Sequence, residues 1–281
     1  MSPMNNRLLV PRKVPGLLDL VPGAAAAYSL RSLSRSYADP VVTVRRSSDD
    51  DEGSFTASEV ADGTLAAFCG AGNGFVKQWW DQSGKQNHMT APAAEQPTIV
   101  SSGSLVTADG ANAIQWASGK RLQANAGSDF AYGTSGVFVS AVVRKTTVSD
   151  NAIFCQTIGG ANYFLFGESS SNALQFLGAL SGGGTGPATP SGTAPLSQLR
   201  VSSVRRLGAS NMEVLINGAV LGTATNSTDF SNTTYKPSIG AYSQNASQLN
   251  WLGQIVEVIV YKGDINDPLR DLITGNQMWN Y

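Results

Sequence analysis

The sequence has little charge of either sign. Only 14% of its 281 residues are charged, against roughly a quarter in an average globular chain, and 19 basic side chains nearly balance 20 acidic ones. The resulting net charge of −1 creates no long-range field that would attract nucleic acid or an anionic membrane. We therefore predict no nucleic-acid partner and no membrane partner.

Histidine and cysteine are scarce as well. His88 is the single histidine, and Cys69 and Cys155 lie far apart without the spacing of a metal site. A structural zinc site takes about four ligands, so we predict neither a metal nor a cofactor. The two cysteines fit either two buried thiols or one disulfide. We favour thiols, because a free cysteine is a common core residue.

Long apolar runs are also missing. No segment of about 18 apolar residues occurs, so we predict no transmembrane helix. Pro15, Asp19 and Pro22 interrupt the one stretch near the amino terminus that resembles a signal peptide, and we predict no such peptide. Prolines spread through residues 1–23 favour extended chain. We interpret residues 1–23 as an anchoring arm that packs either on its own domain or against a larger assembly.

From residue 24 onward, short segments with strand character alternate with turns. Apolar residues at spacings of three and four predict a helix over residues 24–37, and a second helix is expected over 58–68. The predicted strands cover 41–46, 98–100, 113–116, 137–145, 152–157, 163–166, 174–179, 200–206, 212–216, 219–223, 238–241 and 253–261. This series predicts an all-β fold over residues 24–281, a two-sheet antiparallel sandwich with short peripheral helices.

The most unusual stretch is FVKQWWDQSGKQNH, residues 75–88. Adjacent side chains point to opposite faces of an extended segment, so if one of Trp79 and Trp80 lies in the core, the other faces the surface. We expect one of them in the core and take Trp80 as the one that could stack on a sugar ring. The aspartate that follows is expected to accept backbone N–H groups across a turn. The predicted fold-defining turn consists of Asp81, Gln82, Ser83, Gly84 and His88.

A second group of candidate binding residues precedes the last predicted strand. Trp251 fits either core packing or an exposed stacking platform, and neutral polar side chains surround it in the sequence. The candidate ligand-binding residues are Trp80, Trp251, Asn250, Gln248 and Tyr242.

Two segments together resemble a known enzyme family. Residues 26–50, AAYSLRSLSRSYADPVVTVRRSSDD, followed by residues 75–92, resemble the opening of the catalytic domain of fungal and bacterial α-L-arabinofuranosidase B. The same pair is similar to the start of concanavalin A-like or laminin-G-like domains of tailed-phage structural proteins. The resemblance covers roughly residues 24–100 and continues weakly to residue 262. It implies a concanavalin A-like jelly roll.

The enzymes of this family need two carboxylates that flank the scissile bond. The resemblance places the nucleophile at Glu168 and the acid/base near Ser243 and Gln244, where no carboxylate occurs between Asp229 and Glu257. A positioned proton donor is worth about 10²–10⁴ in rate. The missing acid therefore predicts a protein that is not an enzyme.

Our leading hypothesis from the sequence is a non-enzymatic structural protein of a tailed-phage virion, such as a head decoration, a fibre or another tail component. Residues 1–23 would dock it onto other virion proteins, a homo-oligomer is expected, and host surface glycan is the proposed ligand. The first alternative is a glycoside hydrolase of the arabinofuranosidase type with Glu168 as its nucleophile. The second alternative is a virion cement protein without any ligand.

Overall fold

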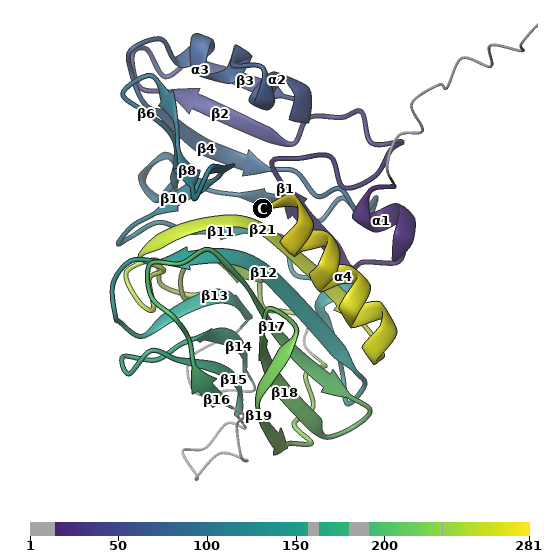
Figure 1. Ribbon diagram of the computed structural model, residues 1–281. Helices are drawn as coiled ribbons and strands as arrows, with labels where there is room; N and C mark the ends of the chain where they lie inside the picture. The colour runs from purple at the N-terminus through teal and green to yellow at the C-terminus, as the bar shows by residue number, and fades with distance from the viewer. Residues whose placement is uncertain (1–14, 157–162, 180–190, 232) are drawn as a thin grey trace, which may run out of the picture.

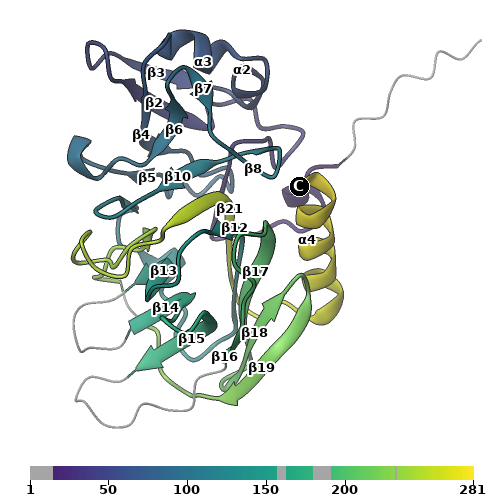
Figure 2. The same ribbon diagram turned by 60° about the vertical axis from the view of Figure 1, so that its left-hand side comes forward.

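The computed structural model describes residues 15–156, 163–179, 191–231 and 233–281. Most of them lie in antiparallel strands, joined into one nearly closed sheet of 19 strands, and a separate two-stranded ribbon lies beside it (Figure 1, Figure 2). The predicted all-β class is confirmed.

The strands are β1 Ala26–Ser29, β2 Val42–Arg46, β3 Glu52–Phe55, β4 Gly74–Trp79, β5 Met89–Thr90, β6 Thr98–Ser101, β7 Ser104–Leu105, β8 Thr107–Ala108, β9 Ala111–Asn112, β10 Ile114–Trp116, β11 Leu122–Gln123, β12 Val137–Lys145, β13 Asn151–Gln156, β14 Tyr163–Glu168, β15 Ala173–Ala179, β16 Ser191–Thr193, β17 Arg200–Leu207, β18 Asn211–Ile216, β19 Ala219–Thr225, β20 Ser238–Ile239 and β21 Gly253–Lys262. The α-helices are α1 Leu17–Leu20, α2 Ala57–Ala61, α3 Thr64–Cys69 and α4 Asp267–Asn280, and short 3₁₀ turns cover Ala93–Glu95 and Ser128–Phe130.

The middle of the sheet is formed by β12 and β21, which pair in antiparallel register along their whole length. The other edge of β12 pairs with β17, and the other edge of β21 pairs with β1 and β10. Both central strands are buried on their two faces except at Arg144 and Lys262. Strands covered on both faces are nearly continuously apolar, as these two sequences are.

The main core lies between two groups of strands. Alternate side chains of β12, from Val137 to Val143, pack in the same buried cluster as the phenylalanines of β13, β14 and β15. The rings of Phe164 and Phe176 lie 4.9 Å apart between their centroids in an edge-to-face arrangement, which is a favourable geometry for aromatic pairs. This aromatic core fixes the position of β14, and therefore of Glu168 at its end.

The β18–β19 hairpin has the turn that its sequence predicts. Asn217 and Gly218 have φ angles of 49° and 82°, so both central residues occupy the left-handed region that a type I′ turn requires. Ile216 and Ala219 pair across the turn. The Asn-Gly pair therefore forms a primed turn.

The helix predicted over residues 24–37 is wrong. Residues 26–29 form β1, which pairs with β21 from Ala26 opposite Val260 to Ser29 opposite Glu257. All four residues of β1 are buried. A strand that is apolar on both faces, followed by a loop with further apolar residues, produces the same spacing as a short amphipathic helix. The short helix predicted over 58–68 is present as α2 and α3.

Residues 15–23 pack on the protein's own sheet. Leu17 and Val21 are buried in a cluster with Ile259 and Tyr261 of β21, and the Tyr261 hydroxyl donates a hydrogen bond of 2.6 Å to the Val21 carbonyl. Residues 1–14 of the predicted arm lie outside the described residues. Its role as an anchor to other proteins stays a prediction.

Helix α4 lies along the outside of the central strands (Figure 1, Figure 2). Asn266 caps it, because its side-chain oxygen accepts the Leu269 N–H at 3.1 Å. None of the helices in the described residues is long and apolar enough to span a membrane. Cys69 and Cys155 are both free and buried, so the expectation of two thiols is confirmed.

Candidate functional site

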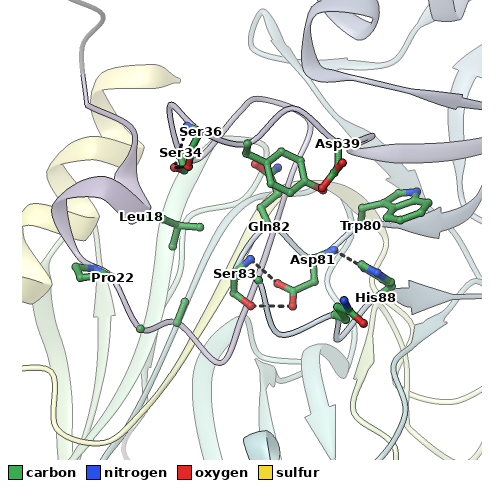
Figure 3. A pocket seen from close by; sticks show the side chains of 15 residues that line it. Leu18, Pro22, Ser34, Ser36, Asp39, Trp80, Asp81, Gln82, Ser83 and His88 are labelled. Atoms are coloured by element: carbon green, nitrogen blue, oxygen red, sulfur yellow. Dashed lines mark hydrogen bonds between the residues drawn. The ribbon is translucent and has the colours of Figure 1, made fainter.

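A cleft of about 580 Å³ opens beside the turn that the sequence singles out, within the range of ~300–1,000 Å³ typical of ligand sites. We call it the 80–88 cleft. Figure 3 shows Leu18 and Pro22 at one end of it and Trp80, Asp39 and His88 at the other. It is lined by Leu18, Pro22, Gly23, Ala24, Ser34, Ser36, Tyr37, Asp39, Trp80, Asp81, Gln82, Ser83, Gly84, Gln86 and His88.

Asp81 organises the floor of the cleft. Its Oδ1 accepts the backbone N–H groups of Ala27 at 2.8 Å and Ser83 at 2.9 Å. Its Oδ2 accepts the Ser83 hydroxyl at 2.7 Å (Figure 3) and the Asn87 N–H at 3.0 Å. Four hydrogen bonds use the acceptor sites of an ionised carboxylate. Asp81 therefore holds the turn together and has no lone pair left for a reaction.

Two amides tie this turn to the amino-terminal strand. The Gln82 side chain accepts the Leu33 N–H at 2.8 Å and donates to the carbonyls of Ser29 and Arg31 at 3.0 and 2.9 Å. The Asn87 side chain donates to the Ala25 carbonyl at 2.8 Å. Both walls of the cleft are thus fixed before any ligand arrives.

Trp80 and His88 form an aromatic wall. Trp79 is fully buried and Trp80 is half-buried, so the expected division between core and surface is confirmed. The Trp80 ring lies 4.6 Å from the His88 ring between centroids, and its Nε1 donates to the Thr43 hydroxyl at 2.9 Å. The polar edge of Trp80 is therefore satisfied within the protein, while part of the ring stays accessible.

His88 is held as a neutral ring. Its Nδ1 accepts the Asp81 N–H at 3.0 Å, so the proton of the neutral form sits on Nε2. Burial lowers the pKa of His88, and the nearby carboxylates of Asp81 and Asp39 oppose this shift without reversing it. Within the described parts of the chain Nε2 has no hydrogen-bond partner. It is a free N–H donor beside the cleft.

Asp39 is the accessible carboxylate of the cleft. Its side chain is exposed, and no hydrogen bond to it occurs within the described residues. Burial raises the pKa of the neighbouring Tyr37 to about 12, with Asp39 and Asp81 adding to the shift, so that phenol stays protonated. The hydroxyl of Tyr37 donates to the Pro40 carbonyl at 2.7 Å.

The arrangement suits binding better than acid–base chemistry. Asp81 has no free lone pair, and His88 presents a donor rather than a base, which leaves Asp39 as the one unpaired carboxylate among the described residues that line the cleft. Glycoside hydrolysis takes a pair of carboxyl groups. In the described residues no group of three or more histidines, cysteines or carboxylates gathers to hold a metal ion.

Glu168, the nucleophile that the resemblance suggests, points into the protein interior. Phe164 and Phe166 of β14 lie in the main core, and side chains alternate along a strand, so Glu168 faces the same way. Its side chain has no exposed surface and forms an ion pair with Arg200. Lys145 Nζ lies 3.4 Å from its second oxygen, and that lysine is also fully enclosed.

The candidates near residue 250 do not join the cleft. Trp251 is fully buried in the main core, so the expectation that it could stack on a ligand is wrong in this structure. Tyr242 packs against the small cluster that contains Cys155. The Asn250 side-chain oxygen Oδ1 accepts from the Ser118 hydroxyl at 3.1 Å, and Gln248 is exposed. Of the five binding candidates, the structure places only Trp80 at the cleft.

Sequence reasoning missed Asp39, Tyr37 and Gln86. Asp39 and Tyr37 belong to a loop that meets the turn only because β1 runs beside the end of β4, a neighbourhood that no local pattern records. Nothing in the sequence distinguishes Gln86; only the structure shows its unusual left-handed φ of 61°.

The sequence matches the family model described as "Alpha-L-arabinofuranosidase B, catalytic" over residues 19–173, which is more than half of the chain. The chain belongs to this family. No curated protein matches it. The arabinofuranosidase resemblance seen in the two sequence segments is confirmed.

Solved arabinofuranosidases have a similar fold. One, complexed with arabinofuranosyl-α-1,2-xylobiose, superposes with a TM-score of 0.62 at 17% identity, and the alignment covers 90% of this chain and 62% of that one. Another, an α-L-arabinofuranosidase soaked with a cyclic sulfate inhibitor, gives a TM-score of 0.62 at 16% identity over the same shares. A Trypanosoma rangeli sialidase gives 0.51 at 14% identity, over 72% of this chain and 31% of that one. This chain thus spans less than two thirds of the arabinofuranosidases it matches.

The family match corrects the function expected from the sequence. The hypothesis of a non-enzymatic phage virion protein is wrong, because both the family model and the similar structures belong to arabinofuranosidases. The tail-fibre and capsid-decoration readings, with or without a ligand, are overturned with it. The prediction of a protein that is not an enzyme rested on one missing carboxylate near Ser243. The family match rests on residues 19–173 and therefore outweighs it.

Proposed function

We propose that the protein is a glycoside hydrolase that acts on α-L-arabinofuranosyl groups of glycans. The observation that carries this proposal is the match of residues 19–173 to the arabinofuranosidase catalytic family. The similar fold of an arabinofuranosidase complexed with arabinofuranosyl-α-1,2-xylobiose supports it. We also infer that the two facing groups of strands form a concanavalin A-like jelly roll, which the shared core between β12 and β13–β15 supports.

Glu168 is the nucleophile in this proposal, and its surroundings set a condition on the reaction. Its carboxylate oxygens lie against Arg200 and Lys145, and an ionised carboxylate is the form that attacks an anomeric carbon. The enclosed side chain has no surface for a sugar to reach. Attack by Glu168 therefore requires its ion pair with Arg200 to open.

The second carboxyl group of the reaction has no counterpart at the position that the family resemblance gives. Ser243 is buried there, with its hydroxyl donating to the Cys155 carbonyl at 2.8 Å. A substrate with a good leaving group needs little protonation, whereas a sugar leaving group depends on it. We expect 4-nitrophenyl α-L-arabinofuranoside to be hydrolysed about 10²–10⁴ times faster than arabinofuranosyl-α-1,2-xylobiose.

The test is hydrolysis of the nitrophenyl substrate by the wild type, by Glu168→Ala and by the carboxylate control Glu52→Gln, whose side chain lies in an exposed ion pair with Lys77. We expect Glu168→Ala to lose at least about 10³ in kcat while Glu52→Gln keeps it, since only the former removes a covalent nucleophile. Added azide should restore turnover to Glu168→Ala, because a small anion can occupy the cavity and attack in place of the carboxylate.

Two outcomes would contradict the proposal in different ways. A wild-type protein without turnover of either arabinofuranoside would remove the hydrolase function. A folded Glu168→Ala variant with wild-type kcat would leave the function in place and make Glu168 a purely structural partner of Arg200.

A further inference from the structure

We propose that the 80–88 cleft is a binding site for a neutral glycan, separate from Glu168 and not part of the hydrolytic step. This proposal goes beyond the hydrolase function, because binding in the cleft does not require Glu168. It follows from the rigidity, the free polar groups and the charge of the cleft.

The walls of the cleft are preorganised. Asp81 closes the turn with four hydrogen bonds, and the Gln82 amide joins the turn to residues 29–33 with three more. The Tyr28 hydroxyl, on a fully buried ring, donates to the Asn87 carbonyl behind the turn. A site that is rigid before binding loses little conformational entropy when a ligand arrives.

The groups left open are those that recognise a sugar. The half-buried Trp80 ring offers apolar surface, His88 Nε2 offers an N–H donor, and Asp39 offers carboxylate acceptors. Sugar rings present an apolar face of C–H groups together with hydroxyls that donate and accept. An accessible aromatic ring with a few fixed polar groups around it is the usual composition of such a site.

The charge of the cleft selects a neutral ligand. Of the described residues that line it, none is a lysine or an arginine, and two are aspartates. His88 adds no positive charge, because burial lowers its pKa and keeps the ring neutral at pH 7. An acidic sugar or a phosphate would meet only negative charge, so pentose and hexose units without acidic groups remain as ligands.

Gln86 supports a functional role for this rim. It is exposed at the edge of the cleft with a φ of 61°, in a region that glycine or asparagine adopts more easily. Strained residues of this kind gather at ligand sites, and the side-chain amide of Gln86 could bond to sugar hydroxyls. A glycine at this position would relieve the strain and remove the amide together.

The cleft and Glu168 lie in different parts of the molecule. The cleft adjoins α1 and the end of β4, whereas Glu168 ends β14 in the opposite half of the sheet (Figure 1, Figure 2). A polymeric substrate held at the cleft would therefore stay bound to the enzyme without occupying the site around Glu168.

The single histidine makes the site directly observable. Because His88 is the chain's only histidine, its ring protons give one resolved pair of proton NMR signals. We would titrate Glu168→Gln, which cannot complete the covalent reaction, with arabinofuranosyl-α-1,2-xylobiose and with xylobiose, and follow these signals together with the heat of binding. We expect saturable shifts of the His88 signals at millimolar or lower concentrations.

Variants decide whether the ligand lies in the cleft. We expect Trp80→Ala to weaken binding at least about tenfold and Gln86→Gly to weaken it about threefold while the protein stays as stable as the wild type. The matched aromatic control is Trp279→Ala, since Trp279 is 88% exposed on α4 and outside the cleft. This control should bind like the wild type.

The proposal is overturned if neither oligosaccharide binds, or if binding heat is measured while the His88 signals stay unchanged. It is also overturned if glucuronic acid-bearing oligosaccharides bind as well as neutral ones. Trp80→Ala removes the hydrogen bond to Thr43, and this loss could unfold the variant. The binding affinity of Gln86→Gly is therefore the second test of the site. Loss of hydrolysis in the wild type would not affect any of these outcomes, so the two proposals fail independently.

Discussion

His88 links the protonation of one ring to the geometry of the turn. Its Nδ1 accepts the Asp81 N–H, and protonation at this nitrogen would break that hydrogen bond. Burial lowers the pKa of His88 below its ordinary 6.5, so the unfolded chain binds a proton more readily than the folded one. The resulting contribution to stability is complete above about pH 6.5 and is lost as the pH falls through the folded-state pKa.

We predict that NMR titration of the His88 ring gives a pKa below 6.5, and that the free energy of unfolding decreases from pH 7 towards that pKa. A His88→Gln variant lacks this titration and serves as the control, because its stability should change less over the same interval. A measured pKa above 6.5 would contradict the hydrogen-bonded, neutral ring.

Glu168 provides the second prediction at the scale of single residues. Its carboxylate pairs with the buried Arg200 and Lys145, and removal of one partner of a buried ion pair costs about 3–5 kcal/mol because the other charge stays buried. We expect Glu168→Gln to lower the free energy of unfolding by about this amount in urea denaturation. The exposed control Glu52→Gln, which breaks a surface pair with Lys77, should cost at most about 1 kcal/mol.

The sequence predicted some residue roles and could not predict others. The Asp81 turn was readable, because an aspartate two residues before a small residue and glycine is a local pattern with a local cause. The burial of Trp251 was not readable, since a tryptophan beside polar residues fits core and surface equally. The inward direction of Glu168 depends on the register of β14 in the sheet, which no local pattern contains.

At the scale of elements, helix α4 is fixed to the sheet through Tyr281, the residue that follows its last turn. The Tyr281 hydroxyl donates to the buried Glu257 carboxylate at 2.8 Å, and Arg31 bonds to the same carboxylate at 2.9 Å. Burial raises the pKa of Tyr281, and the Glu257 charge adds to the shift, so the phenol remains a donor. These contacts also give hydrogen-bond partners to Glu257, a fully buried carboxylate in the otherwise largely apolar β21.

We predict that Tyr281→Phe lowers the free energy of unfolding by about 1–3 kcal/mol, the range of a hydrogen bond to a charged group. Thermal or urea denaturation measures it. Trp279→Ala, two residues earlier on the same helix, should change stability by less than about 0.5 kcal/mol, because that side chain is exposed. Equal losses in both variants would show that α4 is held by general packing rather than by the Tyr281–Glu257 bond.

Long strands rich in β-branched residues were predictable, and the short strand β1 was not, for a physical reason. Val137–Lys145 and Gly253–Lys262 match the predicted strands because their length and β-branched content leave little choice. Residues 26–29 were predicted as part of a helix, since the apolar residues of β1 and of the loop after it fall at spacings of three and four. Their strand state comes from pairing with β21, more than 200 residues later in the chain.

At the scale of the whole molecule, the family was recognisable from two short segments, but the function was not. The resemblance over residues 26–50 and 75–92 reflects the packing of β1 against the Asp81 turn, through contacts such as the Gln82 amide with Ser29 and Arg31. These contacts are structural and involve no catalytic carboxylate. Since the reaction depends on carboxylates placed by other strands, the same segments are compatible with very different functions.

The same contacts predict how the molecule unfolds. The strands around the cleft are joined to the rest of the sheet by three pairings: β1 with β21, β10 with β21 and β5 with β11. Their hydrogen bonding therefore depends on strands outside this group. Chains of this length often unfold in steps. If the strands around the cleft separated from the rest of the sheet, however, β1 would lose its strand partner and the edge of β21 would be unpaired.

We therefore expect a single cooperative transition in urea. The His88 ring signals report on the cleft and far-ultraviolet circular dichroism reports on the whole sheet, and their midpoints should coincide. An earlier loss of the native His88 signals would show that the part around the cleft unfolds on its own, and that β1 gains less from pairing with β21 than its full burial implies.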